Sequence, residues 1–157
     1  MRVFLALTAM LSVGVFISCG GDDEGEGGGG TTRPTAEGVE VKVELREFSV
    51  LPEADSAEAG EITFNVENTG PDDVHELVVV KTELEPDALP SLADGSVDEA
   101  GEGVEVIDEI EDIPVGETQS LTADLEAGVY VLICNIYDEA EAEAHYVEGM
   151  YTAFTVE

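Results

Sequence analysis

Apolar and polar residues alternate strictly over three separate stretches of the chain. VEVKVELR at 39–46, EITFNVEN at 61–68 and SLTADL at 120–125 each carry an apolar residue at every second position, with polar residues between them. Successive side chains of an extended chain point to opposite faces, so a period of two indicates strands with one buried and one wet face. The first of these strands begins at Val39.

Two further stretches are apolar without alternation. HELVVVK at 75–81 predicts a strand that is apolar from Leu77 to Val80. GVYVLICN at 128–135 is apolar on both faces, which is typical of a central strand. VEVIDEIEDI at 104–113 fits either a strand or a short amphipathic segment, and a strand is favoured at its start. MYTAFTVE at 150–157 closes the chain as a last strand.

The connecting segments are rich in turn-forming residues. NTGPDD at 68–73 predicts a turn, and 83–103 is rich in Pro, Gly, Ser and acidic residues, which predicts a long surface loop with one helical turn around 88–93. About seven to eight short strands without a long helical pattern predict an all-β fold, an antiparallel Greek-key β-sandwich.

The N-terminal segment differs in composition from the predicted sandwich. Residues 1–18 combine Arg2 with an apolar run and read as an export signal, and FISC resembles a bacterial lipobox, which would make Cys19 the lipidated first residue of the mature protein. A plain secretory signal with another cleavage point is the alternative. Residues 19–38 are Gly-rich and acidic, which predicts a flexible tether before a folded domain at 39–157. We therefore expect an exported domain, anchored by lipid to the membrane and facing the periplasm or the exterior.

Charge restricts the partners of this domain. The chain has 37 acidic and 5 basic residues, a formal net charge of −32. Such a surface repels nucleic acid and anionic lipid headgroups. It suits a cationic protein partner, bound cations or a salty habitat, and the composition does not choose among these.

Three residue types of the C-terminal third suggest a metal site. If Cys19 carries lipid, Cys134 has no disulfide partner, and a free thiol outside the cytoplasm is protected when it is buried or bound to metal. Ten residues separate Cys134 from His145, and four separate His145 from Met150. The other histidine is His75. Each residue alone has a simpler explanation in a turn or in the core. Together they are the His₂Cys set with a weak axial Met that is typical of blue copper sites.

The motifs around these residues resemble those of the cupredoxins, the plastocyanin- and azurin-like domains. VENTGPDDVHELVVV at 66–80 is similar to the family's strand, turn and histidine-bearing strand start, and GVYVLICN with AHYVEGMYTAFTV is similar to its closing Cys, His and Gly-Met segment. The resemblance covers about residues 39–157. It implies copper ligands at His75, Cys134, His145 and Met150. It also implies a monomeric one-electron carrier rather than an enzyme, with a redox partner such as a c-type cytochrome or an oxidase.

One departure from the family concerns the loop between the cysteine and the second histidine. Ten residues, NIYDEAEAEA at 135–144, stand where small cupredoxins have two to four. The longer loop adds only about 0.8 kcal/mol of closure entropy. Asp138 and Glu141 resemble a helix N-terminal capping pair, so a helical turn is expected here. A carboxylate of Asp138 or Glu139 could then enter the coordination sphere.

Two other functions stay open at this point. A Cu(I) storage or delivery protein would use the same soft ligands, and a cupredoxin-like sandwich without metal would act as a surface binding module. An enzyme is the least supported class, because the chain shows no nucleophile–base pair and the ligand set leaves no open position for a substrate.

Overall fold

A computed structural model describes residues 38–157 of the chain. The predicted leader, the lipidation at Cys19 and all but the last residue of the predicted tether lie outside the described residues. Within the described part, no helix is long and apolar enough to cross a membrane.

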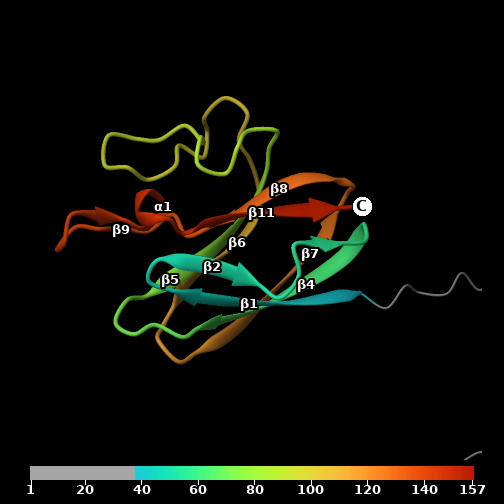
Figure 1. The fold of residues 1–157 in the computed structure, drawn as a ribbon, viewed down its shortest axis with the longest axis horizontal. Coiled ribbons are helices and arrows are strands. Elements are labelled where there is room, and N and C mark those ends of the chain that lie inside the picture. Colours follow the sequence, from blue (N-terminus) through green and yellow to red (C-terminus); the bar gives the residue numbers. More distant parts are fainter. Residues whose placement is uncertain (1–37) are drawn as a thin grey trace, which may run out of the picture. The chain divides into compact units, whose positions relative to one another are not determined.

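Two β-sheets form the domain (Figure 1). The first has the strand order β2-β1-β4-β7 and the second the order β3-β11-β8-β5-β6. The strands of the first sheet are β1 (Val39–Arg46), β2 (Ser49–Pro52), β4 (Gly60–Asn68) and β7 (Thr118–Leu125). Those of the second are β3 (Ser56–Ala57), β5 (His75–Lys81), β6 (Glu105–Ile113), β8 (Gly128–Ile133) and β11 (Tyr151–Val156). A separate hairpin of β9 (Tyr137–Asp138) and β10 (Glu143–Ala144) precedes the one-turn helix α1 (His145–Glu148).

The alternating strands place their apolar residues between the sheets, as predicted. Leu45, Phe64 and Val66 from the first sheet and Leu77 and Leu132 from the second are fully buried in one cluster. Burial of each such side chain contributes roughly 1.5–3 kcal/mol. The predicted all-β sandwich is confirmed. Seven strands of six or more residues carry it, and four shorter ones are added at the edges and at the hairpin.

The sheets are mixed rather than wholly antiparallel. β1 pairs with β4 in parallel, and β11 pairs with β3 in parallel, whereas the other strand pairs are antiparallel. The prediction of an antiparallel sandwich is therefore wrong for these two pairs. Alternation reports which face of a strand is buried and carries no information on the direction of its neighbour.

Residues 82–104 form a cover over the outer face of the second sheet. Val80 and Val131 point away from the central core and are nevertheless fully buried, because Leu89 and Val97 of this segment pack on them. The segment is held by an isolated bridge between Ser91 and Val97 and contains no helix. The predicted long loop is present, but the expected helical turn at 88–93 is wrong, and Leu89 and Val97 attach this acidic segment to the sheet.

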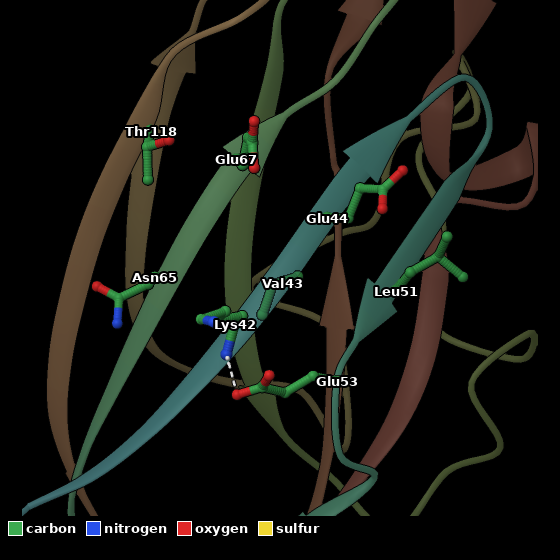
Figure 2. Close-up of a pocket in the computed structure, with 8 residues that line it drawn as sticks. All are labelled: Lys42, Val43, Glu44, Leu51, Glu53, Asn65, Glu67 and Thr118. Atoms are coloured by element: carbon green, nitrogen blue, oxygen red, sulfur yellow. Dashed lines mark hydrogen bonds between the residues drawn. The ribbon is translucent and has the colours of Figure 1, made fainter.

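A shallow hollow lies on the outer face of the first sheet (Figure 2). Its lining includes none of the residues predicted to bind metal. Lys42 lies in it among the carboxylates of Glu44, Glu53 and Glu67, and the Lys42 amide donates a hydrogen bond to Glu53 Oε1. Lys42, Glu44 and Glu67 belong to the wet face of β1 and β4, and Glu53 follows β2.

Candidate metal centre

Three of the four predicted ligands meet in the interior at one end of the sandwich. The Nδ1 atoms of His75 and His145 are 3.2 Å apart, and Cys134 Sγ lies 3.4 Å from His145 Nδ1 and 3.9 Å from His75 Nδ1. All three side chains are almost completely shielded from solvent. Among the described residues they form a group of potential metal donors that contains no carboxylate.

The spacing of these donor atoms fits a single metal ion. Metal–nitrogen bonds of about 2.0 Å and metal–sulfur bonds of about 2.3 Å are usual in proteins. In a trigonal plane they separate the two nitrogens by about 3.5 Å and each nitrogen from the sulfur by about 3.7 Å. The observed separations of 3.2, 3.4 and 3.9 Å lie close to these values. Small side-chain shifts would suffice to place one ion among the three atoms.

His75 is positioned by a turn that is fixed by Asn68. The buried Asn68 side chain donates hydrogen bonds to the carbonyls of Asp73 and Ile113 and accepts one from the amide of Gly70. Gly70 has a φ of 52°, and a Cβ there would lie 2.7 Å from a methyl group of Val115. The turn therefore requires glycine at this position, and it delivers His75 to the first residue of β5.

Cys134 follows directly on β8 and is held by the backbone on both sides. Its amide donates to the carbonyl of Met150 at 3.0 Å, and the amide of Glu76 donates to its Sγ at 3.4 Å. Burial raises the pKa of the Cys134 thiol to about 12. Without metal the thiol is neutral. A metal ion that binds the sulfur as a thiolate must therefore displace the thiol proton.

The ten-residue loop brings His145 back to Cys134 by forming a hairpin. Tyr137 pairs with Ala144 and Asp138 with Glu143, and the amide of His145 donates to the carbonyl of Ile136 at 2.9 Å. The expected helical turn is wrong. Strand pairing returns the chain to its starting point, whereas a helix of this length would carry its end away from Cys134.

Asp138 caps this hairpin and does not join the donor group. Its Oδ1 accepts hydrogen bonds from the amides of Ala140 and Glu141, so the predicted capping role is present within a turn rather than a helix. Glu139 is exposed at the tip. Neither carboxylate belongs to the cluster of close donors.

Met150 lies next to the three donors along the backbone. Its amide donates to the carbonyl of His145, its carbonyl accepts from the amide of Cys134, and its side chain is fully buried in the same core cluster as Cys134. The one-turn helix α1 ends at Gly149, whose φ of 118° permits the abrupt change of direction before Met150. The backbone thus connects Met150 to both Cys134 and His145.

Solved structures of known proteins share this arrangement of strands. No protein-family model and no curated protein matches the sequence. Auracyanin from Roseiflexus castenholzii matches with a TM-score of 0.52 and 20% identity over 76% of this chain and 97% of its own. Auracyanin A, a "blue" copper protein from Chloroflexus aurantiacus, matches with 0.51 and 20% over 76% and 98%, and rusticyanin from Thiobacillus ferrooxidans with 0.53 and 15% over 78% and 79%. The chain has the cupredoxin fold. At this identity the likeness establishes the fold, and function has to be argued from the site.

In this cupredoxin fold, the residue after each of the three donors anchors a neighbouring segment. Glu76 Oε1 accepts from the amide of Asn135 at 2.8 Å, and the Asn135 side chain binds both the amide and the carbonyl of Val97. Tyr146 Oη accepts from the amide of Leu89 and donates to the carbonyl of Pro86. The cover segment 82–104 is therefore tied to the donor residues. These anchors are not predicted by any pattern in the sequence, although their position directly after a candidate ligand is a usable signal.

The turn between β1 and β2 contacts both histidines of the donor group. Glu47 Oε1 lies 3.7 Å from His75 Nε2, and the Phe48 ring packs edge-on against His145 with 5.6 Å between ring centroids. Burial lowers the pKa of both histidines, so both are neutral at neutral pH and retain a nitrogen lone pair for a metal. Burial raises the pKa of Glu47, but hydrogen bonds from the Asp73 and Asp72 amides outweigh this and lower the pKa, which keeps the carboxylate ionised.

Proposed function

We propose that this domain binds one copper ion through His75, Cys134 and His145, with Met150 as a weak axial ligand, and that it acts as a one-electron carrier. The observation that carries the proposal is the buried His-Cys-His group, whose donor atoms are spaced for one trigonal ion. A thiolate and a thioether suit Cu(I), and imidazole suits Cu(II) as well, so the bound ion can cycle between these two states.

The protein contributes a rigid and dry set of donors. Asn68 fixes the turn before His75, the Cys134–Met150 hydrogen bond fixes the end of β8, and the hairpin fixes His145. Donors that are already in place need little rearrangement when the charge of the metal changes. That property favours rapid electron transfer over catalysis. Three equatorial donors and one axial donor leave no open position for a substrate, so a non-enzymatic role follows.

The partner in this proposal is a redox protein with a positively charged surface, such as a c-type cytochrome or an oxidase. Glu139 and Glu141 are exposed on the hairpin that leads to His145, and the net charge of the chain is −32. Val147, two residues after His145, is 60% exposed. An apolar side chain close to acidic groups suits transient docking of a cationic partner.

An extracytoplasmic location and a lipid anchor at Cys19 belong to the same proposal. They rest on the apolar segment 1–18, the FISC motif and the Gly-rich acidic stretch that follows. A domain tethered in this way would act as a monomeric carrier close to a membrane. Mass spectrometry of the membrane fraction tests the anchor, because a diacylglyceryl group on Cys19 adds a defined mass that Cys19→Ser abolishes.

The copper site is tested with the soluble domain from residue 31 onward, which contains both core clusters. One equivalent of Cu(II) should bind and produce intense thiolate-to-copper charge-transfer absorption, and reductant should bleach it reversibly. Cys134→Ser should remain folded and colourless. Tight Cu(I) binding without reversible colour would favour storage or delivery, and a folded domain that binds no copper would contradict the proposal and favour a metal-free binding module.

A further inference from the structure

His75 has one ring nitrogen at the candidate metal site and one that faces away from it. Nδ1 faces the Nδ1 of His145, whereas Nε2 is buried and makes no hydrogen bond to any residue that the structure describes. The carboxylate of Glu47 lies 3.7 Å from this nitrogen, and the Oε2 of Glu47 is likewise buried without a partner among the described residues. Two buried polar atoms without a hydrogen bond, on side chains that lie this close, require an explanation.

The contact between the two histidines limits which ring nitrogen of His75 can carry the proton. In the metal-free protein the 3.2 Å contact between the two Nδ1 atoms is a hydrogen bond only when one ring carries a proton at Nδ1 and the other ring presents a lone pair there. If His75 donated from Nδ1, its Nε2 would present a lone pair to the Glu47 carboxylate. The lone pair and the carboxylate would then repel each other where water does not screen them. If His75 accepts, its Nε2 carries the proton and points it at the carboxylate. The second arrangement is electrostatically favoured.

We infer that Glu47 is a positioning residue for His75: it holds the imidazole as the Nε2–H tautomer, which leaves the Nδ1 lone pair directed into the metal site. The effect of Glu47 on the copper site rests on the proposed function, whereas the tautomer of His75 is a property of the metal-free protein. A carboxylate behind a ligating imidazole is a known means of orienting the ring and raising its basicity.

Glu47 has a second role that the test must separate from the first. Its Oε1 accepts hydrogen bonds from the amides of Asp72 at 3.1 Å and Asp73 at 2.7 Å, which ties the β1–β2 turn to the segment before His75. Glu47→Gln retains a carbonyl oxygen for these two amides, but it removes the charge and replaces the other carboxylate oxygen with an NH₂ donor. A purely structural role for Glu47 predicts that this variant leaves the tautomer of His75 and the redox properties unchanged.

The consequence for the copper site has a definite sign. A negative charge behind His75 favours Cu(II) over Cu(I), because it raises the basicity of the ligand and stabilises the higher positive charge. Removal of the charge should raise the reduction potential. Changes of such supporting groups alter metal affinity by about 10-fold or more, and a tenfold change in the Cu(I) to Cu(II) affinity ratio corresponds to about 59 mV for one electron.

The first experiment uses the metal-free domain labelled with ¹⁵N at histidine. Two-bond proton–nitrogen correlation spectra should show His75 as the Nε2–H tautomer and His145 as the Nδ1–H tautomer. Glu47→Gln should increase the Nδ1–H fraction at His75, whereas Glu148→Gln, which removes an exposed charge three residues from His145, should not. An Nδ1–H tautomer at His75 in the unchanged protein would overturn the inference, even if the variant does not fold.

The second experiment measures the reduction potential of the copper-loaded domain. Glu47→Gln should raise it by about the equivalent of a tenfold change in affinity ratio, and by clearly more than Glu148→Gln. Equal shifts in the two variants would overturn the orienting role, because they would reflect general charge alone. If no copper binds but the tautomers respond as expected, the proposed function fails and the inference about Glu47 stands.

Discussion

The hydroxyl of Tyr146, the residue that follows His145, holds the cover segment 82–104 through two hydrogen bonds, and its removal tests how much they stabilise the domain. It donates to the carbonyl of Pro86 at 2.8 Å and accepts from the amide of Leu89 at 3.0 Å. Tyr146 is buried and Leu89 is 5% exposed, so water cannot easily replace the lost contacts. Each hydrogen bond contributes about 0.5–1.5 kcal/mol net. Tyr146→Phe should therefore lower the free energy of unfolding by about 1–3 kcal/mol.

The assay is urea unfolding of the metal-free domain, because bound metal would add its own stabilisation to the folded state. The midpoint should fall while the slope stays constant, since the area buried in the core is unchanged. Tyr151→Phe is the matched control. Tyr151 packs against Tyr146 with ring centroids 5.3 Å apart, but its hydroxyl makes no hydrogen bond within residues 38–157. A loss for Tyr146→Phe that equals the loss for the control would refute the reasoning.

Two further predictions concern Met150 and the cover segment 82–104. Met150→Leu conserves apolar volume, so it should lower the free energy of unfolding by less than about 1.5 kcal/mol. The variant should keep the charge-transfer colour but have a higher reduction potential, because Cu(II) loses a donor. An unchanged potential in voltammetry would exclude Met150 as a ligand. Hydrogen bonds from Ser96 lower the pKa of Asp94, so its ionised form stabilises the fold above the unfolded-state pKa, and this contribution is lost as pH falls through the folded-state pKa. The difference in the free energy of unfolding between Ser96→Ala and the unchanged domain should therefore shrink as the pH falls from the unfolded-state pKa of Asp94 through its folded-state pKa. A difference that stays constant down to acidic pH in unfolding titrations would contradict a stabilising Ser96–Asp94 interaction.

Several features of the domain were predictable because they depend on the order of residues alone. Alternation along β1, β4 and β7 identifies a buried and a wet face for each strand, whatever the neighbours are. The apolar stretch at β8 likewise indicated a strand that is covered on both faces. The four candidate ligands were found because His75, Cys134, His145 and Met150 belong to residue types with few alternatives in this chain.

The conformation of the loop at 135–144 could not be read from its composition. Ala and Glu favour a helix by only a few tenths of a kcal/mol per residue. Closure of the chain between Ile136 and His145, with pairing of β9 and β10, outweighs that preference. The direction of the β1–β4 and β3–β11 pairs was hidden for a similar reason, because it depends on how distant segments meet.

The sequence by itself determined where the long strands lie, which of their faces are apolar and which side chains could bind a metal, since these follow from local periodicity and side-chain chemistry. Only the tertiary structure decided that His75, Cys134 and His145 meet within 4.8 Å, that Leu89 and Val97 cover β8, and that Glu47 faces the far nitrogen of His75. These are contacts between residues that lie far apart in the chain. Their energies depend on burial and on the position of each charge in space, which no local pattern of residues encodes.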